Sequence, residues 1–169
     1  MQVFEAVRTV LAVRRFAKKP VAADLAHRIV EAGRLSASAV NKQPWHFVVV
    51  EERATLRMIG GIMKTGPYTA DASFAVVVLV EKASSTAVSD TSRAIQNMIL
   101  TAWSEGVGSN WTGFGPMPAI EALLGVPKAY EALAVLPFGY PADALGRGVK
   151  KRRPIGQVAS RERFGTPLV

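Results

Sequence analysis

The sequence contains no cysteine and only two histidines among its 169 residues. Without thiols, the chain can form no disulfide, no thiolate nucleophile and no cysteine-based zinc site. His27 and His46 lie far apart and outside any H-E-x-x-H pattern, so we expect both to be structural or exposed. The chain also lacks a G-x-S-x-G elbow, and its glycine-rich segments 60–67 and 106–113 have neither P-loop nor Rossmann spacing. These absences argue against a metal site and against the commonest forms of covalent catalysis.

Long apolar runs are scarce as well. The longest, Phe74–Val80, is far too short to span a bilayer. The N-terminus carries Glu5 and Arg8 inside its first apolar stretch and lacks a small-residue cleavage site, unlike a signal peptide. We therefore expect a soluble, cytoplasmic protein with no membrane partner.

Acidic residues are outnumbered, 13 against 21 lysines and arginines, which gives a formal net charge of +8. The surplus is concentrated in two clusters, within segments 14–19 and 150–153. Three interpretations follow: a solvated surface, two chain ends that converge on an anion, or a nucleic-acid surface. Neither an RNA-binding signature nor a DNA-reading helix supports the third, so we expect no nucleic-acid partner.

The length of the chain and its 49% hydrophobic composition predict one domain with a sizeable core. Apolar patterning predicts helices over residues 1–13, 22–35 and 52–64 and after Asp90, and strands over 45–50, 73–80 and 133–140. We expect the 45–50 strand to be buried on both faces, because its residues scarcely alternate. Asp90 is placed to cap its helix and Gly106 to end it. This order of elements is typical of an α+β fold.

The segment Ser36–Trp45 joins a predicted helix to a predicted buried strand. Connections of this kind often carry functional sites. Its serine, asparagine and glutamine side chains offer donors and acceptors without net charge. They suit a flat polar heterocycle better than a bare metal ion.

Four segments together resemble the nitroreductase family of flavin mononucleotide (FMN) oxidoreductases. In chain order they are SASAVNKQPWHFVVV, DTSRAIQNMILTAWSEGVGSNWTGF, LLGVPKAYEALAVLPFGYP and KKRRPIGQV. The first matches the family pattern A-P-S-x-x-N-x-Q-P-W-x-F except that Ala37 replaces proline. The resemblance implies a three-layer α-β-α sandwich with a central, mainly antiparallel sheet. It also implies a homodimer with two flavins at its interface, and one domain over residues 1–169 whose segment 155–169 could wrap the partner as an arm.

The resemblance assigns the FMN phosphate to cations from both ends of the chain. Arg14 falls on the last arginine of the family's N-terminal motif, and Lys150 and Arg152 match its C-terminal K-x-R contacts. Val10 and Ala12 replace an arginine and a serine of that motif, which removes one charge and one hydroxyl. The alternatives are a surface ion pair for Arg14 and a solvated basic tail for the other two.

The same resemblance places Ser38, Asn41 and Gln43 along the flavin ring and ribityl chain. Thr112 and Gly113 correspond to the segment whose backbone N–H approaches flavin N5, where a glycine leaves the ring unobstructed. For the serine and the amides, the alternative is loop capping and turn chemistry.

The implied activity is electron transfer from NADH or NADPH, through FMN, to a small acceptor such as a nitroaromatic, a quinone or an enone, by a ping-pong mechanism. Since flavin carries the chemistry, no catalytic side chain is assigned. The stretch between Gly66 and Asp90 is short for the family, which predicts an open, permissive pocket or one completed by another element. Two alternatives stay open: a protein of this fold that binds or consumes flavin or deazaflavin, and a basic polyanion-binding module.

Overall fold

The structure is a computed structural model that describes residues 1–145 and 150–168. Its helices are α1 (Val3–Thr9), α2 (Ala23–Arg34), α3 (Arg53–Ile62), α4 (Ala87–Ser104) and α5 (Pro118–Leu123). Its strands are β1 (Trp45–Val50), β2 (Phe74–Glu81), β3 (Gly108–Ser109) and β4 (Tyr130–Gly139). Short 3-10 helices η1 (Ala39–Asn41), η2 (Pro67–Asp71) and η3 (Ile155–Gln157) lie in the connections. None of the helices in the described part of the chain combines the length and the hydropathy that crossing a bilayer requires.

β2 lies inside the sheet, whose strand order among the described residues is β1-β2-β4-β3, with every neighbouring pair antiparallel. Side chains of a strand alternate between its two faces. The even-numbered residues from Phe74 to Val80 accordingly pack into one core cluster, and the odd-numbered residues from Ala75 to Leu79 pack into another. Both faces of β2 are therefore buried from solvent, which explains its unbroken apolar sequence.

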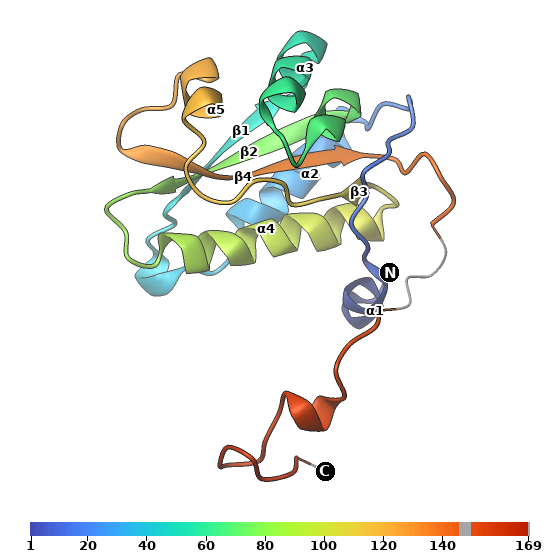
Figure 1. Cartoon of the computed structure of the whole chain (residues 1–169), viewed down its shortest axis with the longest axis vertical. Coiled ribbons are helices and arrows are strands. Elements are labelled where there is room, and N and C mark those ends of the chain that lie inside the picture. Colours follow the sequence, from blue (N-terminus) through green and yellow to red (C-terminus); the bar gives the residue numbers. More distant parts are fainter. Residues whose placement is uncertain (146–149, 169) are drawn as a thin grey trace.

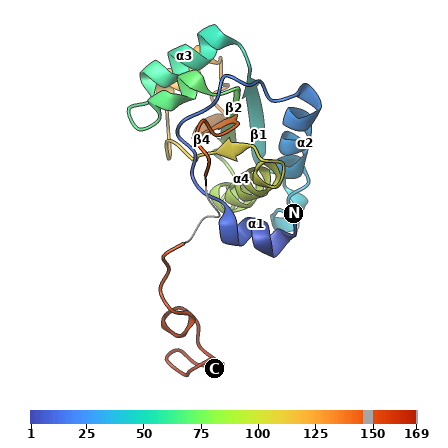
Figure 2. The ribbon, with the colours of Figure 1, turned by 90° about the vertical axis from the view of Figure 1, so that its right-hand side faces the viewer.

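Helices cover both faces of this sheet (Figure 1). α2 and α4 pack against one face through residues such as Ile29 and Ile95, and α3 and α5 pack against the other through Leu56 and Ile120. Figure 2 shows α3 on the opposite side of the strands from α2 and α4. The predicted three-layer α-β-α sandwich with a mainly antiparallel central sheet is confirmed.

The first helix is shorter than its pattern predicted. α1 ends at Thr9, and the chain then becomes extended because the Val13 N–H donates to the carbonyl of Ser109 at 2.9 Å. Pairing with β3 thus replaces the last helical turn. The expected apolar stripe is also uncovered: Phe4 is 77% exposed and Val7 45%.

β1 is an edge strand, and the expectation that it is buried on both faces is wrong. It pairs with β2 on one side, and among the described residues no strand pairs with its other side. His46 is exposed, and Val49 is 42% exposed. Its apolar residues reflect partial burial at the sheet edge.

The chain after Lys150 runs out of the body of the protein (Figures 1 and 2). Its apolar side chains are largely uncovered, with Ile155 59% and Phe164 fully exposed. Near the end, Arg161 Nη2 donates to the carbonyl of Leu168 at 2.7 Å and folds the tip back on itself. The described part of the predicted arm, residues 155–168, is therefore exposed along nearly all of its length; Val169 lies outside the described residues.

Candidate functional site

A groove of about 320 Å³ brings the two ends of the chain together. Its walls come from residues 10–12, from residues 109–111 after α4, and from the α4 side chains of Gln96 and Ile99. Lys150 and Arg152 line it from the C-terminal side. The structure thus unites both predicted C-terminal cations with the N-terminal segment. We call this space the cation groove.

The backbone of the N-terminal segment is seated closely on β3. A Cβ atom at Gly108 would lie 2.3 Å from Cγ2 of Val13, so only glycine allows this approach. Val13 is buried, while Ala12 and Arg14 are exposed on either side of it. Ala12 lines the cation groove, whereas Arg14 is not among the residues that line it. Among residues 1–145 and 150–168, no carboxylate forms an ion pair with Arg14.

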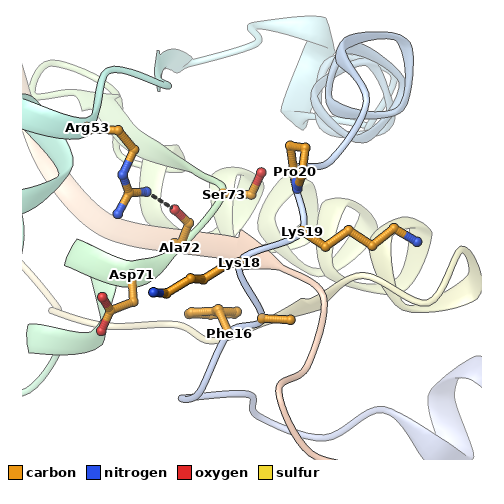
Figure 3. A pocket seen from close by; sticks show the side chains of 9 residues that line it. Phe16, Lys18, Lys19, Pro20, Arg53, Asp71, Ala72 and Ser73 are labelled. Atoms are coloured by element: carbon orange, nitrogen blue, oxygen red, sulfur yellow. Dashed lines mark hydrogen bonds between the residues drawn. The ribbon is translucent and has the colours of Figure 1, made fainter.

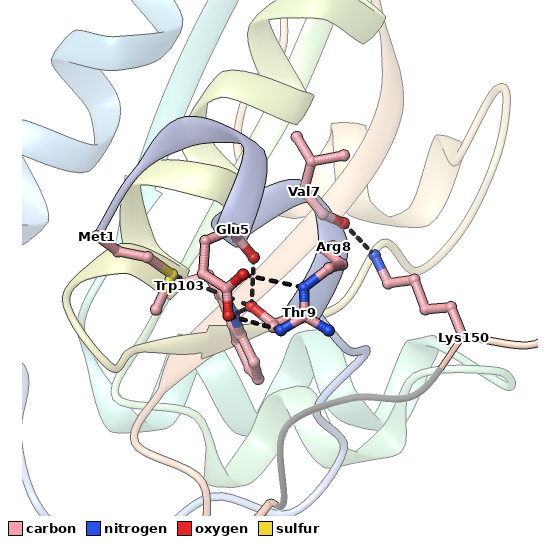
Figure 4. A network of polar contacts seen from close by, with 7 residues as sticks. All are labelled: Met1, Glu5, Val7, Arg8, Thr9, Trp103 and Lys150. Carbon is pink, nitrogen blue, oxygen red and sulfur yellow. Dashed lines mark hydrogen bonds and ion pairs between the residues drawn. The ribbon is translucent and has the colours of Figure 1, made fainter.

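Lys150 is anchored to the first helix (Figure 4). Its Nζ donates to the carbonyl of Val7 at 2.5 Å across 143 positions of sequence. α1 is itself held to α4, since Trp103 Nε1 donates to Thr9 Oγ1 at 3.0 Å. Burial lowers the pKa of Lys150, and the positive charge of Arg152 lowers it further. Two neighbouring cations that repel each other are well suited to an anion between them.

Thr112 and Gly113 come directly after the groove-lining residues 109–111 in the sequence. Thr112 is buried, and its backbone pairs with Val135 in both directions, with its N–H donating at 3.0 Å. Gly113 has a φ of +73°, which favours glycine, and Trp111 Nε1 donates to its carbonyl at 2.8 Å. On the far side of Gly113 lies a second groove of about 330 Å³, lined mainly by apolar residues: Ile62, Met63, Phe114, Met117, Pro118 and Ala119. We call it the apolar groove.

The segment 36–45, which we call the amide loop, is held by bonds among its predicted site residues. The Gln43 N–H donates to Ser38 Oγ at 2.9 Å, and Gln43 Nε2 donates to Asn41 Oδ1 at 3.2 Å. Val40, Asn41 and Gln43 have φ values of +44°, +57° and +51°. Such backbone costs non-glycine residues roughly 1–2 kcal/mol each. Ser38 thus performs the loop capping that was the alternative interpretation, while the side chains of Asn41 and Gln43 are exposed.

α4 fixes the amide loop through two side chains that sequence reasoning missed. Asp90 was expected to cap α4, but the helix begins at Ala87, and the fully buried Asp90 carboxylate accepts the N–H of Ala39 at 3.1 Å. Two helical turns later, Asn97 Nδ2 donates to Ser36 Oγ at 2.7 Å. These contacts join the loop to the helix at two places.

The charge on Asp90 is maintained by its surroundings. Burial alone would raise its pKa, but a hydrogen bond with Thr86, the N–H of Ala39 and the charges of Arg93 and Lys42 together lower the pKa below its ordinary value. The Arg93 guanidinium donates directly to Asp90 Oδ1. Asp90 is therefore a carboxylate over the whole neutral range.

The amide loop contacts α4 at Asp90 and again at Asn97, whereas the cation groove is lined by Gln96 and Ile99 of the same helix. The loop contacts Asp90 near the start of the helix, whereas the N-terminal segment pairs with Ser109 beyond its end. Within one protomer the structure therefore gathers Lys150 and Arg152 beside Ala12 and the segment leading to Gly113, and none of Ser38, Asn41 and Gln43 lines the cation groove.

Comparisons with known proteins agree on one family. The sequence model described as "Nitroreductase family" matches residues 8–83 and 67–140. A protein of Methanothermobacter thermautotrophicus, provisionally named NADH dehydrogenase/NAD(P)H nitroreductase, is 35% identical over 154 residues, covering 86% of this chain and 81% of its own length. The crystal structure of a Bacteroides thetaiotaomicron protein with the same provisional name superposes with a TM-score of 0.88 at 27% identity, covering 96% of this chain and 98% of that one. An FMN-dependent nitroreductase of Clostridium difficile shares the fold, with a TM-score of 0.87 at 19% identity and coverage of 95% and 99%.

Proposed function

Because the chain belongs to the nitroreductase family, we propose that it is an FMN-dependent oxidoreductase that passes electrons from NADH or NADPH to a small acceptor such as a nitroaromatic, a quinone or an enone. FMN, when bound, supplies the hydride and electron chemistry that side chains cannot perform alone. The chain's own part is to hold the cofactor's phosphate, to keep one face of its ring accessible and to admit one small molecule at a time.

The cation groove suits the phosphate. Lys150 and Arg152 supply two positive charges, and Arg14, exposed two residues after Ala12 of the groove wall, is a third cation that we assign to the phosphate. Asn110 and Gln96 add neutral amides to the lining. Arginine and lysine together are the usual ligands of a phosphate dianion. The lowered pKa of Lys150 also fits, because an anion beside it would favour the charged form of the amine.

The backbone at Thr112 and Gly113 suits the ring. Gly113 presents no side chain, so its N–H can approach a flat cofactor and stabilise negative charge that develops there. Beside it, the apolar groove offers Met63, Phe114 and Met117 as contacts for a flat, electron-poor molecule. A single groove of this size holds the nicotinamide donor or the acceptor in turn, which is why we expect ping-pong kinetics.

A homodimer would complete this site. No residue of the amide loop lines the cation groove of its own protomer, but a two-fold axis repeats every contact reciprocally and can bring the loop of one copy to the groove of the other. Exposed apolar residues lie where such a partner could cover them: Met1 with Val3, Phe4 and Val7 of α1, Leu35 beside the amide loop, Val40 within it, and Phe164 of the arm. In this arrangement Asn41 and Gln43 would contact the ring across the interface.

The observation that carries the proposal is the convergence of Lys150 and Arg152 on the N-terminal segment in one groove. The test is an absorption spectrum of the purified protein before and after incubation with FMN and desalting, followed by anaerobic NADH or NADPH. We expect a retained flavin spectrum that the nicotinamide bleaches and an added quinone restores. Protein that stays colourless after incubation with FMN would refute the proposal.

Val10 and Ala12 favour a second candidate, a protein of the same fold that carries flavin or deazaflavin or consumes it as a substrate. Both residues line the cation groove where the family motif has an arginine and a serine, so the groove has fewer phosphate contacts. A loosely held cofactor would dissociate readily. Flavin that binds but is not bleached by NADH or NADPH would support this candidate over the first.

A further inference from the structure

A separate cavity of about 510 Å³ lies beside the sheet, between the segment 16–20, the start of α3 and the junction of η2 with β2 (Figure 3). None of its lining residues belongs to the cation groove or to the apolar groove. Its chemistry therefore has to be explained independently of flavin binding.

Two cations of the cavity are available to a ligand. Arg53 is held in place because its Nη1 donates to the carbonyl of Ala72 at 2.5 Å and its Nη2 donates to the carbonyl of Ala70, which leaves other N–H groups of the guanidinium free. Lys18 forms no ion pair or hydrogen bond within residues 1–145 and 150–168. Lys19, by contrast, is engaged, with its Nζ 4.3 Å from the centre of the Tyr140 ring. Figure 3 shows its side chain running away from Arg53.

The remaining walls combine apolar surface with one hydroxyl. The Phe16 ring lies below Lys18, and Pro20 lies near Ser73 (Figure 3). Ser73 Oγ accepts the N–H of Val21 at 2.8 Å, so its own proton can be donated to a ligand. The donors from Arg53, Lys18 and Ser73 thus surround a partly apolar space.

Asp71 is the one carboxylate that lines the cavity among the residues that the structure describes. It is exposed and forms no ion pair with Lys18 or Arg53 within the described residues. Two available cations against one acid leave the cavity positive. The acid should repel a bound anion, and its removal should strengthen binding.

We infer that this cavity is a second binding site, for a small molecule that carries a phosphate or a carboxylate on an aromatic or aliphatic body. The oxyanion lies between Arg53 and Lys18 with the Ser73 hydroxyl as a third donor. The apolar body of the ligand packs against Phe16 and Pro20.

The test uses the full chain saturated with FMN, so that the cation groove is occupied, and titrates phenyl phosphate, inorganic phosphate, benzoate and benzyl alcohol by calorimetry. We expect phenyl phosphate or benzoate to bind and benzyl alcohol not to bind. The anion that binds more tightly, phosphate or carboxylate, identifies the charged group of the ligand that the cavity prefers. Tighter binding of phenyl phosphate than of inorganic phosphate shows that the aromatic wall contributes to the affinity. If the protein takes no FMN, the same titration in a Lys150→Ala, Arg152→Ala background keeps the test independent of the proposed function.

Substitutions at two exposed positions should change the affinity for the anion in opposite directions. Lys18→Ala should weaken binding of the preferred anion by about fivefold and Asp71→Asn should tighten it by about twofold, as expected for charges near the surface. Lys82→Ala, at an exposed lysine outside the cavity, is the matched control and should change nothing. The inference is overturned if neither anion binds, or if Lys18→Ala and Lys82→Ala have equal effects.

Discussion

Gly113 faces the thioether of Met117 so closely that a Cβ atom at Gly113 would lie 2.6 Å from Met117 Sδ. The same atom would lie 2.9 Å from Cε of Met63. Both methionines line the apolar groove, so a side chain at this position would intrude on the space in which we place the donor and the acceptor. The ends of methionine side chains are flexible and can yield, so the fold should survive such a change.

Gly113→Ala should therefore lower turnover with NADPH and a quinone by about tenfold while the protein still folds, at a cost of roughly 1 kcal/mol in unfolding free energy from the positive φ. Gly115→Ala is the control for backbone strain alone, since Gly115 has a φ of +86° and open space around it. Gly61→Ala controls for the added methyl group and should be neutral or slightly stabilising. Equal steady-state kinetics for the Gly113 and Gly115 variants would contradict the assignment.

Asp90 should act as a positioning residue for the amide loop. Asp90→Ala leaves the Ala39 N–H without its acceptor and releases a loop that holds three residues at positive φ. We expect FMN affinity to fall by roughly five- to tenfold, measured by fluorescence titration, with less loss in Asp90→Asn, which keeps an acceptor oxygen. Asp24→Ala, at an exposed acid in the first turn of α2, is the matched control. Unchanged affinity in a folded Asp90→Ala protein would show that the loop shape is irrelevant to the cofactor.

The groove wall at Val10 and Ala12 offers a gain-of-function test. Val10→Arg with Ala12→Ser restores the charge and the hydroxyl of the family motif beside Lys150 and Arg152. A charge-assisted hydrogen bond to the phosphate should raise FMN affinity by about tenfold or more and steepen its salt dependence. Met58→Arg adds the same charge on α3, where Met58 is 47% exposed, and should leave affinity unchanged. A double variant that binds no tighter than the parent would place the phosphate elsewhere.

FMN binding should depend on the protonation of Lys150. Its pKa in the free protein lies below 10.5, and a phosphate beside it would raise that pKa. Binding therefore takes up a proton wherever Lys150 is neutral, so affinity is complete below the lowered pKa and falls as pH rises through it. Titrations between about pH 7 and pH 10 measure this effect. Lys150→Met should weaken binding and remove this part of the pH dependence; an unaltered slope in that variant would exclude Lys150.

Much of the fold could be predicted from local patterns. β2 was found because both of its faces are buried, and α2 because its apolar residues recur at helical spacing. The errors arose where a tertiary contact decided the outcome. The helical pattern continued to Val13, but bonding to Ser109 turned those residues into an extended segment. β1 resembled an inner strand because apolar composition alone does not reveal which strands become its neighbours.

The candidate site also divides into features that follow from local sequence and features that depend on tertiary contacts. The chain ends meet at Lys150 and Arg152 as the family motif implied. Asp90 and Asn97 escaped prediction because both act across space, on residues 51 and 61 positions away, and neither contact leaves a local sequence signal. The absence of the amide loop from the lining of the cation groove was also invisible in the sequence, since it depends on how both segments pack around α4.

The separation of the amide loop from the groove lining leads to a prediction about assembly. If the amide loop reaches the groove of a partner, the intact chain should sediment as a dimer, and Phe4→Asp should weaken the dimer and FMN binding together, because Phe4 is an exposed apolar residue of α1. Removal of residues 155–169 should have the same combined effect, since that segment exposes Ile155, Val158 and Phe164. Met58→Asp, at a comparably apolar position on α3, is the matched control. A monomeric chain that retains flavin would show that Asn41 and Gln43 take no part in the site, and the amide loop and the cation groove would then need separate explanations.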